Sequence, residues 1–356
     1  MQKPLILVIN PGSTSTKIAL FREKDCIQSH EITHPAAELA TFKRNLDQLE
    51  YRTKAVRDAL ANWNIELNVL AAIIGRGGPL KPLTGGVYHL GEALLADLHS
   101  GKLMDHASIL GGIIAYTLAK QVNLPAFIAD PISVDEFDEI ARISGCPELP
   151  RISYSHTLNI KAVAAEYAEE IKKPVEKLNL VVAHLGGGIS IAAHKQGRQV
   201  DVNNANDGGP FSPERAGTIP LTGLLKMCFS GKFTHDELRK KLIGKGGMMA
   251  HLGTADAREV LARIENGDTK AALILEAMAY GIAKEIGAMA TVMHGKVDAI
   301  ILTGGLAYPK KLTDWISERV SFIAPVVVKP GQNEMKALAA HALHALQDHS
   351  AVKEYA

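Results

Sequence analysis

Three loops carry the residues best suited to chemistry. The first, NPGSTSTK at residues 10–17, places two serine and two threonine hydroxyls beside a glycine and a lysine. Hydroxyls, backbone N–H groups and an ammonium suit phosphate oxygens, which accept many hydrogen bonds at close range. The segment is not a Walker A loop, because the second glycine is missing, and it lacks the GxGxxG dinucleotide fingerprint. A serine- and threonine-rich hairpin turn is the alternative interpretation.

The two other loops are rich in glycine. HLGGGIS at residues 184–190 contains three consecutive glycines, and TGGLAYP at residues 303–309 follows an apolar run. A glycine cluster alone is typical of a turn, although it also lets a ligand approach the backbone closely. A glycine pair at the carboxyl end of a buried strand is where open α/β sheets bind ligands. Because three such loops occur in one chain, we predict a phosphate-binding function for them.

The first two loops each lie between strand-like segments. Gly12 and Gly186, one in each loop, are 174 residues apart (186 − 12), about half of the chain. This spacing predicts two related domains, each of which opens with a hairpin whose tip can contact a ligand. The predicted hairpin strands are residues 5–12, 17–21, 178–185 and 189–202, the last with a turn near Gly197.

The rest of the chain alternates helical and strand patterns, which is typical of an α/β fold. Turn residues in GCPELPR at residues 145–151 favour a boundary near Pro150. We therefore predict domains at 1–150 and 151–333, and a C-terminal helix at 334–349 that can pack back on the first domain. Helices are expected near 107–121, 158–172, 269–294 and 334–349, and buried strands at 70–76, 125–131, 297–305 and 323–331.

Composition excludes several functional classes. The 356 residues include 39 Lys and Arg against 38 Asp and Glu, without a basic stripe, which argues against a nucleic-acid partner. No apolar stretch approaches the roughly 18 residues of a membrane span, and no secretory signal pattern is present. The three cysteines are scattered and form no CxxC pair, which argues against disulfides and zinc. We expect a cytoplasmic protein without a membrane partner.

Three segments together carry a resemblance to a known family. They are VINPGSTSTKIALF at residues 8–21, the block 184–220 that runs from HLGGGIS to ERAGTIP, and GQNEMKALA at residues 331–339. In this order they resemble the acetate kinase family of the acetate and sugar kinase, heat-shock chaperone and actin superfamily, and within it most of all the butyrate kinase branch. The resemblance extends from about Leu5 to about Ala340.

The resemblance implies a fold and a function. The fold is α/β, with two related actin-like, ribonuclease H-like domains and a nucleotide cleft between them. The function is the reversible, ATP-dependent phosphorylation of a short-chain carboxylate, in the first place butyrate, to an acyl phosphate and ADP. ATP or ADP and Mg²⁺ are the implied cofactors. A homodimer or a larger homo-oligomer is the implied assembly.

The same resemblance assigns roles to individual residues. Arg76 in IIGRGGPL corresponds to the arginine that binds the substrate carboxylate, and Asn10 and Glu334 correspond to the metal site. The catalytic residues of the family correspond to Asp130, His156 and Arg215. The nucleotide contacts correspond to Ser13, Ser15, Lys17, His184, Gly186, Gly187, Gly188, Asp256, Arg258, Gly304 and Gly305.

These assignments agree with the chemistry of the proposed transfer. A carboxylate is already ionised at pH 7, so the protein needs cationic groups that neutralise two anions rather than a base. Arg76 and Arg215 offer planar forks for carboxylate and phosphoryl oxygens. A kinase of a neutral hydroxyl substrate on the same fold needs a base, and Asp130 can serve as one. A non-catalytic, nucleotide-regulated binding protein is the third hypothesis.

Overall fold

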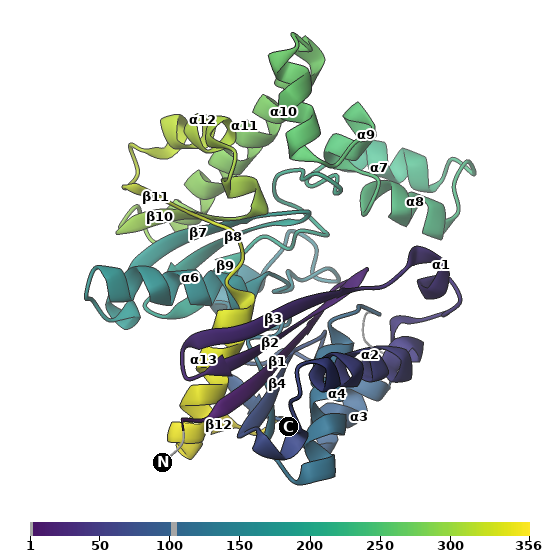
Figure 1. Cartoon of the computed structure of the whole chain (residues 1–356). Helices are drawn as coiled ribbons and strands as arrows, with labels where there is room; N and C mark the ends of the chain where they lie inside the picture. The colour runs from purple at the N-terminus through teal and green to yellow at the C-terminus, as the bar shows by residue number, and fades with distance from the viewer. Residues whose placement is uncertain (1–2, 101–104) are drawn as a thin grey trace. The chain divides into compact units, whose positions relative to one another are not determined.

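The computed structural model describes residues 3–100 and 105–356 (Figure 1). The chain divides into two compact units, the first formed by Met1–Asp135 and Asn333–Ala356 and the second by Glu136–Gln332. On this division the predicted boundary near Pro150 lies inside the second unit. The chain therefore contributes to the first unit twice, once from each end.

The first unit is built on a seven-stranded sheet. β1 to β3 form an antiparallel meander, whereas β4 runs parallel to β1, and β6 runs parallel to β4. In spatial order the strands are β12 (Val352–Lys353), β5 (Val87–His89), β6 (Ala126–Ala129), β4 (Ala72–Arg76), β1 (Leu5–Pro11), β2 (Ser15–Arg22) and β3 (Asp25–Thr33). The helices are α1 (Ala36–Leu39), α2 (Leu49–Asn62), α3 (Glu92–His99), α4 (Ile109–Ala119) and α13 (Glu334–Gln347).

The second unit repeats this topology on a five-stranded sheet. Its strand order is β11 (Val326–Pro330), β10 (Ala299–Gly304), β7 (Asn179–Leu185), β8 (Ile189–Lys195) and β9 (Arg198–Val202). β7 to β9 form an antiparallel meander, and β10 and β11 continue the sheet in parallel, as β4 and β6 do in the first unit. Both predicted hairpins and the predicted duplication are therefore confirmed.

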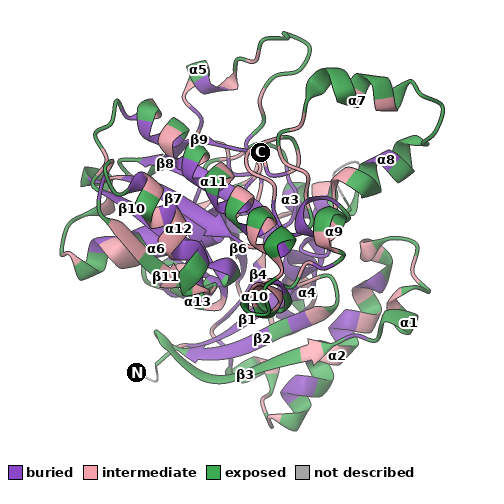
Figure 2. Ribbon diagram, turned by 90° about the horizontal axis from the view of Figure 1, so that it is seen from above, coloured by how far each residue is buried: buried purple, intermediate pink, exposed green. Residues whose placement is uncertain are grey.

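The helices of the second unit cover both faces of its sheet. Alternate residues of β7 face opposite sides: Val181 and Ala183 pack in the core under α11, whereas Leu180 and Val182 pack in the core under α6. Figure 2 shows β7, β8 and β10 mostly buried and α7 mostly exposed. The helices are α5 (Glu139–Arg142), α6 (Thr157–Glu170), α7 (Leu221–Cys228), α8 (His235–Leu242), α9 (Gly247–Leu252), α10 (Ala257–Glu265), α11 (Thr269–Val292) and α12 (Lys310–Val320).

A helix that spans a membrane needs about 20 apolar residues. Within residues 3–100 and 105–356, none combines the necessary length and apolar character, and α11 with 24 residues is the longest.

A close contact between β4 and α4 fixes the strand that ends at Arg76. A Cβ atom on Gly75 would overlap the backbone carbonyl of Gly111, and a Cβ on Gly111 would lie 2.8 Å from the backbone nitrogen of Arg76. Only glycine allows this separation of strand and helix. Because side chains alternate along a strand, Gly75 faces α4, whereas Arg76 extends from the opposite face of the sheet, toward α13.

We predict that Gly75→Ala lowers the free energy of unfolding by about 1–3 kcal/mol or more, because the new methyl group has no space in this backbone contact. Chemical denaturation of the purified variant measures the effect. Gly287→Ala is the matched control, since a Cβ at this position of α11 would meet no described atom within 4 Å. The control is expected to be neutral or stabilising by up to about 1 kcal/mol. Equal stability of the two variants would contradict the prediction.

Candidate functional site

Three predicted site residues of the first unit form one buried cluster. β1 and β4 are parallel neighbours with Ile9 opposite Gly75, so Asn10 and Arg76 leave the sheet side by side at its carboxyl edge. Glu334, in the first turn of α13, accepts hydrogen bonds at Oε2 from Asn10 Nδ2 at 2.7 Å and from Arg76 at 3.2 Å. The Glu334 side chain is 6% exposed and that of Arg76 is 18% exposed. Arg76, which is predicted to bind the substrate carboxylate, thus contacts Asn10 and Glu334, which are predicted to bind the metal.

Asp130 is held from two sides directly after β6. Its Oδ1 accepts a hydrogen bond from Gly86 N at 2.7 Å, and its backbone N–H donates to Gly86 O at 3.1 Å. Its Oδ2 lies 2.9 Å from Nε2 of His341, which belongs to α13. Asp130 is 2% exposed and has a φ of 39°, a left-handed conformation that is uncommon for a residue other than glycine. This combination of strain and anchoring is frequent at functional sites.

The predicted phosphate donors of the β1–β2 hairpin contact a carboxylate. Ser15 Oγ donates to Glu31 Oε1 at 2.7 Å, and Lys17 Nζ lies 3.9 Å from Glu31 Oε2. Glu31 belongs to β3 and is the cross-strand partner of Lys17. Ser13 is exposed at the tip. A phosphate group that binds Ser15 and Lys17 therefore competes with Glu31 for the same donors.

In the second unit, two predicted site histidines stack on each other. The rings of His156 and His184 lie 4.0 Å apart between centroids and are inclined by 12°. His156 precedes α6, and its Nδ1 lies 2.9 Å from Ser190 Oγ in β8. His184 lies near the end of β7 and is completely buried. The hairpin and the start of α6 thus bring together residues that are 28 positions apart (184 − 156).

Asn159 lies between the His184 ring and Thr303. Asn159 Nδ2 donates to Thr303 Oγ1 at 3.3 Å, and Thr303 Oγ1 in turn donates to Gly331 O at 3.2 Å. With its amide oriented in this way, Asn159 Nδ2 also donates to His184 Nδ1 at 2.9 Å. The tautomer of the ring decides which of its nitrogens carries a proton. His184 Nε2 lies 3.5 Å from the amide nitrogen of Gln332 and next to Gly186, because a Cβ on Gly186 would be 3.1 Å from it.

Arg215 lies directly against the glycine loop. A Cβ on Gly188 would overlap the guanidinium of Arg215, so a larger residue would push this side chain away. Ser212 Oγ donates to Gly187 O at 2.5 Å and joins the same segment to the loop. Burial lowers the pKa of Arg215, but a guanidinium remains charged at neutral pH. The structure therefore places a cation at the tip of the second hairpin.

The predicted adenosine contacts lie in two segments, one at the start of α10 and the other at the end of β10. Asp256 is the N-cap of α10, and it accepts hydrogen bonds from Arg258 N at 2.9 Å and from the Arg258 guanidinium at 2.7 Å. The hydrogen bond from this arginine lowers the pKa of Asp256 to about 2. Gly304 ends β10 with a φ of 92° and lies against the carbonyl of Leu185. A Cβ on Gly305 would meet no described atom within 4 Å.

The described residues contain no group of three or more His, Cys, Asp and Glu side chains that could hold a metal. The cluster in the first unit nevertheless offers one carboxylate, from Glu334, and one amide oxygen, from Asn10. Mg²⁺ prefers hard oxygen ligands, and it usually binds through one or two carboxylates together with water and substrate phosphates. These two residues fit that pattern.

Several residues that contact the predicted site residues were not predicted from the sequence. His341 follows Glu334 by seven positions, so it lies on the same face of the predicted helix, two turns further on. Asn159 follows His156 by three positions at the start of α6. Helical spacing from a predicted site residue is thus a signal that points to both. Glu31 had no such signal, because its strand partner Lys17 is known only once the register is known.

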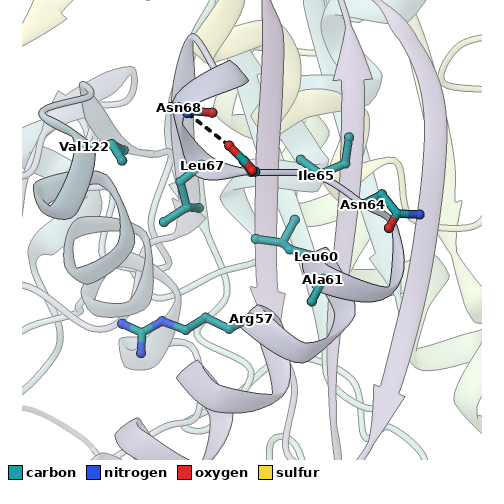
Figure 3. Close-up of a pocket in the computed structure, with 9 residues that line it drawn as sticks. Arg57, Leu60, Ala61, Asn64, Ile65, Leu67, Asn68 and Val122 are labelled. Carbon is teal, nitrogen blue, oxygen red and sulfur yellow. Dashed lines mark hydrogen bonds between the residues drawn. The ribbon is translucent and has the colours of Figure 1, made fainter.

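A separate hollow lies away from these residues in the first unit. It has a volume of about 570 Å³ and is lined by the end of α2, residues 64–68 and Val122 (Figure 3). These segments precede β4 and β6, so the hollow is at the amino ends of the strands, whereas Arg76 and Asp130 lie at the carboxyl ends. It contains none of the predicted site residues.

Residues 153–313 match the model of the acetokinase family. An acetate kinase structure from Porphyromonas gingivalis superposes with a TM-score of 0.80 at 18% identity and covers 97% of this chain and 100% of its own. A propionate kinase from Francisella tularensis gives a TM-score of 0.71 at 18% identity, with 95% and 98% covered.

A more distant likeness points to the same architecture. A ROK family protein from Streptococcus pneumoniae gives a TM-score of 0.51 at 12% identity, with 96% of this chain and 99% of that chain covered. Identities this low show the fold alone. The chain therefore has the actin-like two-domain α/β fold of the acetate kinases and ROK proteins, and its residues 153–313 carry the sequence pattern of the acetokinase family.

Proposed function

We propose that the protein transfers the γ-phosphoryl group of ATP to a short-chain carboxylate, and that butyrate is the preferred acid. A carboxylate oxygen attacks the γ-phosphorus, the bond from this phosphorus to the β–γ bridging oxygen breaks, and ADP leaves with that oxygen. No proton is transferred, because the acid is already ionised. The observation that carries the proposal is the buried cluster of Asn10, Arg76 and Glu334 at the strand ends.

In this proposal the first unit binds the acid and the metal. Arg76 offers its guanidinium to the substrate carboxylate, and its Nη1 donates to Glu334 Oε2. Asn10 and Glu334 would hold Mg²⁺, which when bound offsets negative charge on the phosphates. The hairpin residues Ser13 and Lys17 then contact phosphate oxygens.

The second unit in this proposal neutralises the group in transfer. Arg215 and His184 Nε2 lie at the glycine loop, where Arg215 can donate to phosphate oxygens. His156 stacks on His184 and is the donor to an equatorial oxygen. Gly304, Gly305, Asp256 and Arg258 are the proposed adenosine contacts. The homo-oligomer that the resemblance implies stays a prediction.

A kinase of a neutral hydroxyl substrate is the main alternative. Such an enzyme needs a base, and the ROK likeness and Asp130 are the observations that favour it. Both carboxylate oxygens of Asp130, however, already have a partner in Gly86 N–H or His341 Nε2. An anchored carboxylate is better suited to orient groups around the reaction than to accept a proton. We therefore favour the carboxylate kinase.

We predict that the purified protein forms acyl hydroxamates when ATP, Mg²⁺, hydroxylamine and a short acid are mixed, because hydroxylamine traps acyl phosphates. In a series from acetate to valerate with isobutyrate, butyrate is expected to give the highest kcat/KM. If kcat/KM is highest for acetate or propionate, butyrate is not the preferred acid, but the reaction class is unchanged. If ATP binds but no acid of two to six carbons gives a product, the carboxylate kinase is refuted.

Arg76→Ala is expected to raise KM for the acid about tenfold or more, because a charge-assisted, two-point contact is lost, while KM for ATP changes far less. Initial rates at varied acid and ATP concentrations measure the two constants. Arg22→Ala, at an exposed arginine of β2, is the control and should leave both constants unchanged. An equal rise in both constants for Arg76→Ala would argue against carboxylate binding by this residue.

His341→Leu is expected to lower kcat about tenfold, because the Asp130 carboxylate then loses the contact between its Oδ2 and His341 Nε2. His341→Gln keeps a donor at the end of the side chain and should recover most of the activity. His344→Leu, on the exposed side of the same helix, should behave as the wild type. Steady-state rates test this prediction. A His341→Gln variant that is as inactive as His341→Leu would refute the proposal that His341 orients Asp130.

A further inference from the structure

A buried arginine lies beneath the tip of the first hairpin. Arg52 belongs to α2 and is completely buried. Its guanidinium donates to three hairpin carbonyls: Gly12 O at 2.8 Å, Ser13 O at 3.0 Å and Ser15 O at 3.0 Å. It also donates to Thr16 Oγ1 at 3.1 Å and to Gln48 Oε1 at 2.9 Å. Arg52 thus binds the predicted phosphate loop from its inner side.

The charge of Arg52 has no carboxylate counter-ion among residues 3–100 and 105–356, since all of its partners there are neutral oxygens. His34 shares a partner with Arg52, since its Nε2 lies 2.8 Å from Thr16 Oγ1, and burial together with Arg52 lowers the pKa of His34 to about 4, so it is neutral. Tyr51 also lies nearby, and burial raises its pKa. Glu38 acts on both His34 and Tyr51. A buried cation without a counter-ion is costly, and burial lowers the pKa of Arg52 itself.

The same contacts decide what the hairpin presents to solvent. Thr14 O accepts a hydrogen bond from His34 N at 2.9 Å, so four consecutive carbonyls, of residues 12–15, are bound by donors of the protein. Carbonyl oxygens carry partial negative charge and repel phosphate oxygens. With these carbonyls fixed inward, the exposed side chains of Ser13 and Thr14 remain at the tip. The hairpin is therefore shaped for an anion before any anion binds.

We propose that Arg52 is a positioning residue for phosphate binding, which holds the carbonyls of Gly12, Ser13 and Ser15 away from the ligand and completes its own charge balance only when a phosphate group occupies the hairpin. This inference deepens the proposed function and rests on it. In this proposal the hairpin binds a polyphosphate, and both Arg52 and Lys17 offset the negative charge of this ligand. A purely structural role would stabilise the hairpin without changing the affinity for phosphate.

The test compares Arg52→Gln and Arg52→Lys with Arg57→Gln in the full-length protein. Arg57 is an exposed arginine of the same helix, so its variant removes the same charge from α2 without touching the hairpin. Binding of ADP and of inorganic tripolyphosphate is measured by calorimetry, and folding by circular dichroism. We expect Arg52→Gln to weaken both ligands about tenfold or more, Arg52→Lys to weaken them less, and Arg57→Gln to leave them unchanged.

Kinase assays add a second readout. The proposal requires Arg52→Lys to raise KM for ATP while KM for the acid stays near the wild-type value. Equal binding by the Arg52 and Arg57 variants would overturn it, as would a wild-type protein that binds neither ligand. If Arg52→Gln does not fold, the comparison rests on Arg52→Lys, and unchanged binding by that variant overturns the proposal. A wild-type protein that binds tripolyphosphate but forms no acyl phosphate would refute the proposed function alone.

Discussion

The buried ion pair between Arg76 and Glu334 is the interaction on which the candidate site of the first unit depends. It joins the end of a central strand to the start of the last long helix, 258 positions apart in the chain. Glu334 also binds Asn10, so one carboxylate connects the ends of two parallel strands. Taking both charges out of water is costly, and the pair is stable only because additional hydrogen bonds satisfy it. Seven positions along the same helix, His341 reaches Asp130 at the end of a third strand.

Much of this architecture follows from local patterns. The apolar runs before Gly12 and Gly186 predict the two hairpins, because a buried strand must end where its backbone turns, and the structure has both. The helix predicted from Glu334 begins at that residue. The strand ends at Arg76 and Gly304 also agree with the predicted runs within one or two residues. In each case the signal is the periodicity of apolar residues within a single segment.

The contacts between distant segments were not accessible from such patterns. Arg52 looks like any arginine of an amphipathic helix until the hairpin carbonyls are seen around its guanidinium. Glu31 meets Lys17 only through the register of β2 and β3, which a β-bulge near Phe21 changes along the same pair of strands. His341 meets Asp130 only because α13 packs against the first sheet. Long-range packing therefore decides which of the chemically capable residues can act together.

The return of α13 to the first unit also governs the order in which the protein can be completed. Residues 334–347 are synthesised after the whole of the second unit. They nevertheless pack against the first sheet and contact Asn10, Arg76 and Asp130. During synthesis the first 135 residues consequently lack a helix that their core requires, and the buried strand β1 has one face without its final cover. Domains usually fold in order from the N-terminus as they emerge. Here the unit that emerges first is the one that is finished last.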